Sequence, residues 1–108
     1  METISFSDFK KIEVRIGKIV AAQKIESSNK LLQLEVDFGV EGKRQILAGI
    51  AKFYAPEVLV GKLCPFAFNL ETKKLGELES QGMMLCADNG EPVLLHPDKE
   101  IPPGSIVK

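Results

Sequence analysis

The segment LLQLEVDFG (residues 31–39) alternates between apolar and polar side chains along its whole length. Its apolar positions on one face are Leu32, Leu34, Val36 and Phe38. Because successive side chains of a strand point to opposite faces, this period of two predicts a β-strand with one buried face and one wet face. The segment therefore predicts a β-sheet as the framework of the fold.

The segments that flank this strand predict its neighbours in the sheet. On one side, IEVRIGKIVAAQKI (12–25) alternates in its first half, and Gly17 within it indicates a bulge or a sharp bend. The intervening ESSN (26–29) has the composition of a turn. On the other side, VEGKR (40–44) is predicted as a hairpin loop and QILAGI (45–50) as the returning strand.

The rest of the chain adds short strands and brief helical turns. AKFYAPEVLVGK (51–62) is predicted to be helical, with a proline early in a turn and a glycine at its end. Phe6–Phe9 is predicted as one helical turn capped by Ser7 or Asp8, and ETKKLGELES (71–80) as a polar loop. Three more strands are expected, at LCPFAFNL (63–70), where Pro65 indicates an edge or a bulge, at QGMMLCAD (81–88) and at PVLLHP (92–97).

Five or six short strands, with a small helix between the third and the fourth, favour an all-β barrel. The OB-fold, a five-stranded Greek-key barrel that binds oligonucleotides on one face, is the common barrel of this size. A β-sandwich is the alternative. With 108 residues and no Pro/Gly-rich linker before its end, the chain fits a single domain over residues 1–108.

The composition gives little support to catalysis or to metal binding. Cys64 and Cys86 form no CxxC pair and are expected to be reduced, buried thiols, and the one histidine, His96, lies in a loop-like LLHPD segment. We therefore expect no catalytic residues, no metal site and no cofactor. No apolar run approaches the ~20 residues of a membrane span, so a cytoplasmic protein without membrane partners is expected.

The charges are distributed unevenly along the chain. The net charge is −1, but residues 10–52 hold nine Lys or Arg against five Asp or Glu, whereas residues 53–108 hold five against eight. The overall balance argues against indiscriminate coating of nucleic acid and leaves a local basic face open. Most of the six phenylalanines fall at core-alternating positions, which favours recognition of a folded RNA shape over threading of a single strand.

A series of motifs is more specific than these patterns. The chain contains, in order, VRIGKIV (14–20), NKLLQLEVDFG (29–39), RQILAGIAKFYAPEVLVGK (44–62), Asn69-Leu70, SQGMMLCADNGE (80–91) and LLHPDKEIPPG (94–104). In this order and spacing they resemble the tRNA-binding domain at the C-terminus of methionyl-tRNA synthetases. The same domain occurs as a free-standing bacterial tRNA-binding protein and in cytokine-related tRNA-binding proteins of eukaryotes. The resemblance covers residues 6–108.

The resemblance implies an OB-fold with a C-terminal extension, residues 92–108, which with the barrel forms a two-fold homodimer. It implies a non-catalytic module that binds tRNA by shape, at the outside corner of the L. The module would be free-standing, or the C-terminal domain or beta subunit of methionyl-tRNA synthetase, which it would assist in trans. The apolar segment Ile101–Val107 supports the dimer because it is too apolar for a free tail.

The chain departs from the family pattern at two places. Where many relatives have His-Pro and Ala-Asp-Lys in the first turn, it has the segment Ile25–Lys30, and only the lysine remains. Where many relatives have a basic Lys-Leu-Arg-Gly before the SQGM motif, it has KLGE (74–77). The second change removes one potential phosphate contact and adds an acid.

The candidate tRNA-binding residues are cations that could reach phosphates, together with polar and flexible side chains near SQGM. The hydroxyl and the amide of this motif suit phosphate, ribose or a base edge, and its methionine could lie under an unstacked base. The candidates are Arg15, Lys18, Lys30, Lys43, Arg44, Asn69, Lys73, Lys74, Ser80, Gln81 and Met83. The alternative roles are a solvated surface for the cations, a turn cap for Asn69 and core packing for Met83.

A protein-interaction dimer of the same fold is the alternative function, because a bacterial export-related chaperone has this fold and a related sequence. The acidic balance and the missing arginine favour that alternative. The intact SQGM and RQI–AGIA pattern favours tRNA.

Overall fold

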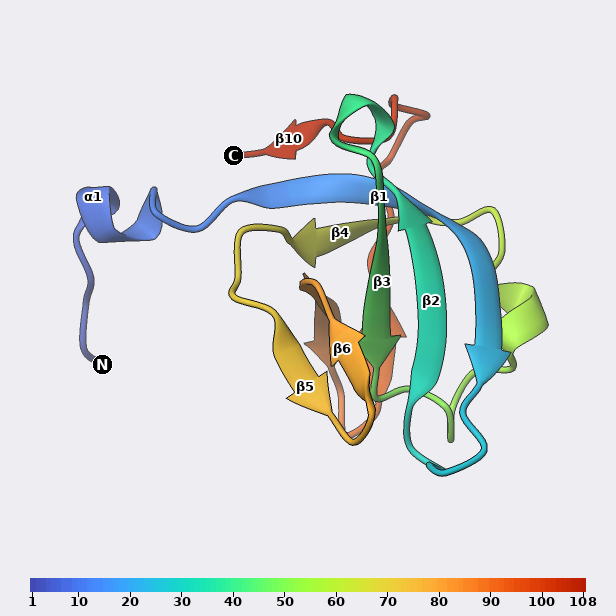
Figure 1. Ribbon diagram of the computed structural model, residues 1–108. Coiled ribbons are helices and arrows are strands. Elements are labelled where there is room, and N and C mark those ends of the chain that lie inside the picture. Colours follow the sequence, from blue (N-terminus) through green and yellow to red (C-terminus); the bar gives the residue numbers. More distant parts are fainter.

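The computed structural model describes all 108 residues and shows a strongly curled antiparallel sheet with a projecting N-terminal arm (Figure 1). The main sheet has the strand order β3 (Lys43–Ala48), β2 (Leu32–Asp37), β1 (Val14–Lys24), β4 (Leu63–Ala67), β7 (Met83–Met84), and β10 (Ile106–Val107) pairs with β1. Two hairpins join it, β5 (Lys73–Leu75) with β6 (Leu78–Ser80), and β8 (Cys86–Asp88) with β9 (Pro92–Leu94). The helical elements are α1 (Phe6–Phe9) and the 3₁₀ turns η1 (Gly39–Glu41) and η2 (Pro56–Val58).

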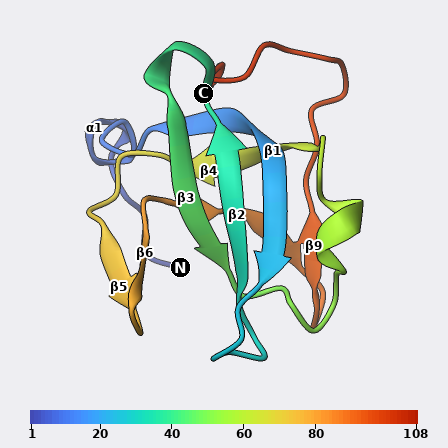
Figure 2. The same cartoon turned by 45° about the vertical axis from the view of Figure 1, so that its right-hand side comes forward.

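The predicted all-β, OB-type class is confirmed. The sheet curls into a half-barrel, and η2 lies between β3 and β4 in the chain (Figure 2). The predicted count of five or six strands is too low, because the main sheet has six strands and four more form the two hairpins. The helical passage expected over residues 51–62 is reduced to turns and the three residues of η2. No helix in the structure combines the length and the apolar character that a membrane crossing requires.

Strand β1 makes the sheet curl, because it changes partners along its length. Its residues 14–18 pair with β4 and its residues 18–24 pair with β2. Gly17 lies at this change, and a Cβ there would overlap the side chains of Val36 and Phe38. The predicted irregularity is confirmed in two parts: the register shifts between Ile19 and Ala21, and Gly17 allows the close approach.

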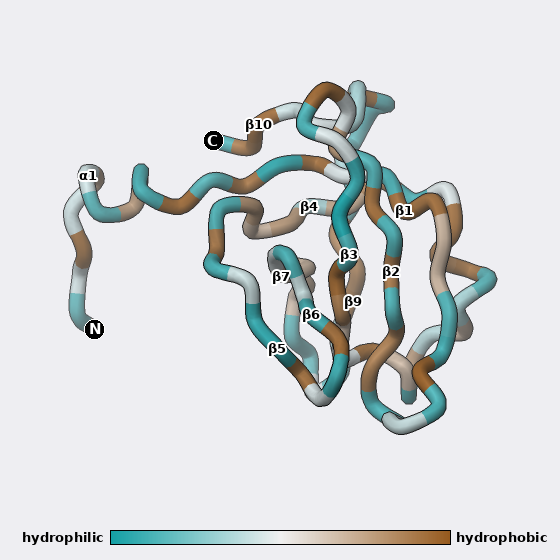
Figure 3. Tube along the Cα trace, viewed as in Figure 1, coloured by the Kyte–Doolittle hydropathy of each residue, from teal (hydrophilic) through white to brown (hydrophobic).

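The core contains the apolar face predicted from residues 31–39 together with apolar side chains of β1, β3 and β4, and Figure 3 shows the alternation of the predicted strand. Phe38 is fully buried, and its ring packs edge-on against Phe66 and Phe68 with centroid distances of 5.5 and 5.0 Å. Both cysteines are free, as predicted, but only Cys64 is fully buried, and burial raises the pKa of its thiol to about 11. Cys86 is half-buried.

Strand β4 lies between β1 and β7, so the edge position suggested by Pro65 is wrong. The carbonyl of Pro65 accepts a hydrogen bond from the backbone nitrogen of Leu85 at 3.0 Å, on the β7 side. Because the nitrogen and the carbonyl of one strand residue point the same way, the donor that proline lacks also faces β7. In β4, pairing with β7 is limited to Phe66 and Ala67. The hydrogen bond that proline cannot donate is therefore missing at the end of this short pairing.

Three local predictions differ from the structure. Residues 71–80 form the β5–β6 hairpin rather than a loop, with Gly76 in the turn at φ 66°. The strand expected at 81–88 is divided into β7 and β8, which pair with different partners. The N-terminal turn is capped by Ser5, whose Oγ accepts a hydrogen bond from the backbone nitrogen of Asp8 at 3.1 Å, and not by Ser7 or Asp8.

The N-terminal arm precedes β1 and extends away from the barrel (Figure 1). Asn69 holds the base of the arm: its Oδ1 accepts from the nitrogen of Glu13 and its Nδ2 donates to the carbonyl of Lys11, both at 2.7 Å. No residue of α1 is buried, and Phe6 and Phe9 are 86% and 56% exposed. The expectation that phenylalanines lie in the core is therefore wrong for the arm, and also for the exposed Phe53.

Candidate nucleic-acid interface

Ser80 and Gln81 close the half-barrel along the free edge of β3. The nitrogen of Gln81 donates to the carbonyl of Gln45 at 2.8 Å, and the Oε1 of Gln81 accepts from the nitrogen of Gln45 at 3.0 Å. The Oγ of Ser80 accepts from the nitrogen of Leu47 at 3.0 Å and donates to the carbonyl of Gly82 at 2.9 Å. These groups satisfy backbone donors on the edge of β3 that pairs with no strand of the main sheet.

Ser80 and Gln81 together form a seam along β3, and Gly82 lets this seam lie close to β4. Its φ is 138°, and a Cβ there would lie 2.9 Å from the carbonyl oxygen of Ala67 and 3.2 Å from Cδ1 of Ile46. Only glycine fits this conformation and this space. The Ser80 hydroxyl and the Oε1 of Gln81 thus have partners within the protein. The exposed members of the motif are Gln81 and Met83, the latter at 49%.

We expect Ser80→Ala to lower the free energy of unfolding by about 1–3 kcal/mol, because it leaves the buried backbone donor of Leu47 without a partner. Urea denaturation measures this loss. Ser7→Ala on the exposed arm is the matched control and should change stability by less than about 0.5 kcal/mol. A Ser80→Ala protein as stable as the Ser7→Ala protein would contradict the role of Ser80 in the seam.

Both predicted arginines lie against the ring of Phe68. The guanidinium carbon of Arg44 is 3.5 Å from the ring centroid, and its Nη1 donates to the carbonyl of Phe68 at 2.6 Å. The guanidinium carbon of Arg15 is 5.1 Å from the same centroid, and Arg15 donates to Glu13 and to the carbonyl of Gly104, each at 2.8 Å. The hydrogen bond to Glu13 raises the pKa of Arg15. Both arginines are half-buried and use their donors inside the protein.

The exposed predicted cations are lysines, most of them in loops and in the β5–β6 hairpin. The ion pairs of the structure are Lys11–Asp8, Arg15–Glu13 and Lys43–Glu35, so four of the predicted lysines have no carboxylate partner. These four are Lys18, Lys30, Lys73 and Lys74. Lys43 lies 3.6 Å from Glu35, with both side chains largely exposed.

Sequence reasoning missed Lys52, an exposed lysine in the loop that contacts Lys30. The carbonyl of Lys30 accepts a hydrogen bond from the nitrogen of Ala51 at 3.1 Å, so the loop after β3 lies against the β1–β2 loop. Both loops and the turn of the β5–β6 hairpin lie at the lower end of the barrel in Figure 1. The contact joins loops that are distant in the sequence, and no local motif signals it.

A hollow of about 680 Å³ lies between the β5–β6 hairpin and the barrel. It brings together four of the predicted residues, which are Lys73, Lys74, Ser80 and Met83. Leu47 and Leu70 add apolar surface, and the two lysines are exposed at the hollow. Such a site can take the planar face of a base while the lysines meet phosphate.

The two lysines of the hairpin differ in their surroundings. Lys74 is opposite Glu79 in the register of the hairpin, although the two form no ion pair, whereas Lys73 is opposite Ser80. Lys73 is therefore the stronger candidate for a phosphate contact. Of the remaining predicted residues, Lys18 lies on β1 and Lys43 on β3, outside this hollow.

Comparison with known proteins identifies the family. Residues 14–106 match the family described as "Putative tRNA binding domain". A methionine–tRNA ligase of Methanothrix thermoacetophila is 52% identical over 106 residues, which cover 97% of this chain but only 16% of that enzyme. A methionyl-tRNA synthetase (MetRS)-related protein from Pyrococcus horikoshii has a TM-score of 0.90 at 36% identity, with full coverage of both chains.

The chaperone CsaA from Bacillus anthracis str. Ames is similar in structure to the same degree. Its TM-score is 0.90 at 31% identity, and the match covers 99% of this chain and 100% of that one. Proteins with different names therefore share this fold. The sequence match to the tRNA-binding domain family extends over residues 14–106. The resemblance inferred from the motifs is confirmed, and the chain belongs to the tRNA-binding domain family.

Proposed function

We propose that this chain is a non-catalytic module that binds tRNA by its folded shape, as a symmetric homodimer in the cytoplasm. It serves methionyl-tRNA synthetase as a C-terminal domain, as a beta subunit or as a free-standing partner. The observation that carries the proposal is the hollow beside the β5–β6 hairpin, where Lys73 and Lys74 stand without ion-pair partners next to exposed Met83.

The placement of the free lysines supports recognition of a folded RNA. Lys30, Lys52 and the β5–β6 hairpin lie on separate loops around one end of the barrel. Cations spaced in this way meet phosphates of different RNA segments, which reads the shape of the backbone and not its sequence. Exposed aromatic platforms for a single strand are scarce on the barrel, because Phe38, Phe66 and Phe68 are buried.

The arm and the C-terminal extension support the homodimer. The arm presents Phe6 and Phe9 to solvent on a helical turn that packs against nothing in its own chain. A hollow of about 430 Å³ opens where the extension meets β1 and β4, and its apolar lining is Ile16, Pro65, Leu95, Ile101, Ile106 and Val107. Exposed aromatic side chains and an apolar hollow on one chain complement each other in a two-fold dimer.

Lys73→Ala is expected to weaken tRNA binding and to lower the slope of log affinity against log salt concentration by about one, because one phosphate contact is lost. Binding to tRNA across a salt series measures both quantities. Lys99→Ala is the matched control, since Lys99 is exposed in the C-terminal extension between Asp98 and Glu100, away from the hollow.

The same titration decides between the two functions. If Lys73→Ala and Lys99→Ala have equal effects, the assigned tRNA surface is wrong. If the unmodified protein binds no tRNA at any salt concentration, the tRNA proposal is overturned and a protein-interaction dimer of this fold takes its place.

A further inference from the structure

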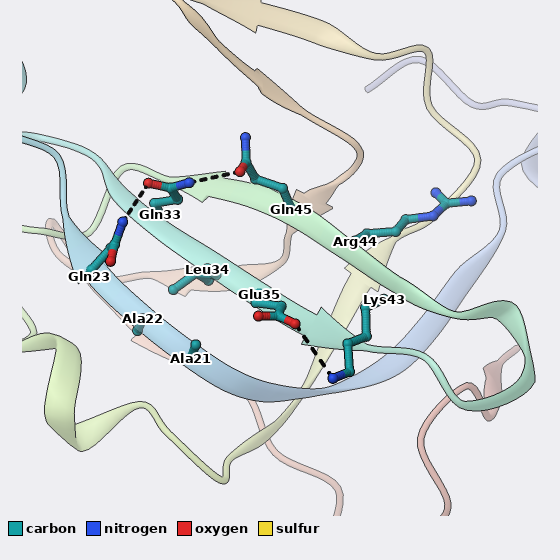
Figure 4. Close-up of a pocket in the computed structure, with 9 residues that line it drawn as sticks. All are labelled: Ala21, Ala22, Gln23, Gln33, Leu34, Glu35, Lys43, Arg44 and Gln45. Atoms are coloured by element: carbon teal, nitrogen blue, oxygen red, sulfur yellow. Dashed lines mark hydrogen bonds and ion pairs between the residues drawn. The ribbon is translucent and has the colours of Figure 1, made fainter.

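Three glutamines form a hydrogen-bonded row across the outer face of the sheet (Figure 4). Gln23, Gln33 and Gln45 lie on β1, β2 and β3. The Nε2 of Gln23 donates to the Oε1 of Gln33 at 2.9 Å, and the Nε2 of Gln33 donates to the Oε1 of Gln45 at 2.8 Å. The row ends in the seam, where the Nε2 of Gln45 donates to the carbonyl of Glu79 at 2.9 Å.

The seam fixes the orientation of all three amides. The carbonyl of Glu79 only accepts hydrogen bonds, so the amide group of Gln45 must point toward it and the Oε1 of Gln45 must face Gln33. The same reasoning then orients Gln33 and Gln23 in turn. A face that would otherwise carry freely rotating amides is thus pre-organised, which lowers the entropic cost of binding a ligand there.

The amides retain unused hydrogen-bonding capacity on the side that faces solvent. A primary amide has two N–H groups and two carbonyl lone pairs, and the row uses one of each on Gln33 and only one N–H on Gln23. Beside the row is a hollow of about 360 Å³ with Ala21 at one wall, whereas the side chain of the next residue, Ala22, packs against the core (Figure 4). The site therefore offers paired donors and acceptors beside a small flat surface.

The charges on this face select against a phosphate at its centre. Glu35 lines the hollow, and its carboxylate forms an ion pair with Lys43. A phosphate over the middle of β2 would meet this carboxylate, whereas a neutral ring with N–H donors would not. The fitting ligand is an uncharged planar group that presents a donor and an acceptor side by side, and nucleobase edges have this character.

We propose that the glutamine row binds one unpaired adenine of the bound RNA. This inference rests on the proposed tRNA-binding function and adds a base contact to the phosphate contacts of the lysines. Glutamine pairs with adenine through N6 and N7, the arrangement that the free N–H and carbonyl groups of Gln23 and Gln33 offer. The hollow beside Ala21 would accommodate the edge of the purine.

The test uses the full chain and two fluorescently labelled single-stranded RNAs of equal length, oligoadenylate and oligouridylate, with tRNA in parallel. We expect the unmodified protein to bind oligoadenylate about tenfold more tightly than oligouridylate, in the range of one bidentate base contact. Gln33→Met should bring this ratio close to one and leave the salt slope unchanged, because no phosphate contact is lost. Gln23→Met, at the open end of the row and away from the seam, should reduce the ratio without altering the unfolding transition.

The outcomes separate this inference from the function on which it rests. Equal affinity for the two oligonucleotides, or a preference that survives both substitutions, overturns the adenine site. The tRNA proposal then stands if tRNA binding still depends on Lys73. Failure to bind tRNA and both oligonucleotides overturns the proposed function and the adenine site together.

Discussion

Phe38→Ala is expected to lower the free energy of unfolding by about 3–5 kcal/mol, the range for truncating a fully buried phenylalanine. The ring of Phe38 contacts Phe66 and Phe68 edge-on. It also packs against Gly17, where β1 approaches the ring closely. Its backbone is also packed tightly, since a Cβ on Gly104 would overlap the carbonyl of Phe38. Loss of the ring therefore loosens the bend of the sheet, whereas the backbone contact with the C-terminal extension is retained.

Chemical denaturation monitored by far-ultraviolet circular dichroism measures this loss, because the chain contains no tryptophan. Phe53→Ala is the matched control, since that ring is 45% exposed and its removal should cost far less. A Phe38→Ala protein as stable as the Phe53→Ala protein would show that the core does not centre on Phe38.

The parts of the fold that the sequence predicts best are those with a strong local pattern. The alternation of residues 31–39 fixes which side chains point inward, and Leu32, Leu34, Val36 and Phe38 are all buried. The β5–β6 hairpin lacks such a pattern, because its strands are three residues long, polar and largely exposed. Pairing of backbone groups holds that hairpin, and residue type gives little information about it.

The candidate site is harder to predict, for a different physical reason. Hydrogen bonds between residues far apart in the sequence occupy Arg44, Asn69, Ser80 and Gln81, as in the bond from Arg44 to Phe68 and that from Leu47 to Ser80. A polar side chain suits an internal seam and an RNA phosphate equally well, so residue type alone does not separate these roles. Lysines with long, flexible side chains are placed more reliably, because they remain at the surface unless they are paired.

The double variant Phe6→Asp with Phe9→Asp is expected to convert the proposed dimer into monomers and to lower the affinity for tRNA by about a hundredfold. Both rings are exposed on the arm, and charges there are incompatible with burial in the apolar hollow of a second chain. A dimer presents two lysine surfaces to one RNA, and linking two weak sites typically gains about 10²–10⁴ in avidity. The unfolding transition of the monomer should be unchanged, because α1 buries no residue in its own chain.

Light scattering at micromolar concentration and tRNA titration of the same samples test this prediction. Val58→Asp is the matched control, because Val58 is 53% exposed in η2, which lies at the opposite side of the barrel from the arm in Figure 1. A double variant that remains dimeric would contradict the arm's role in assembly. A monomeric variant with undiminished tRNA affinity would show that a single barrel suffices for binding, and the two-fold arrangement would then need another purpose.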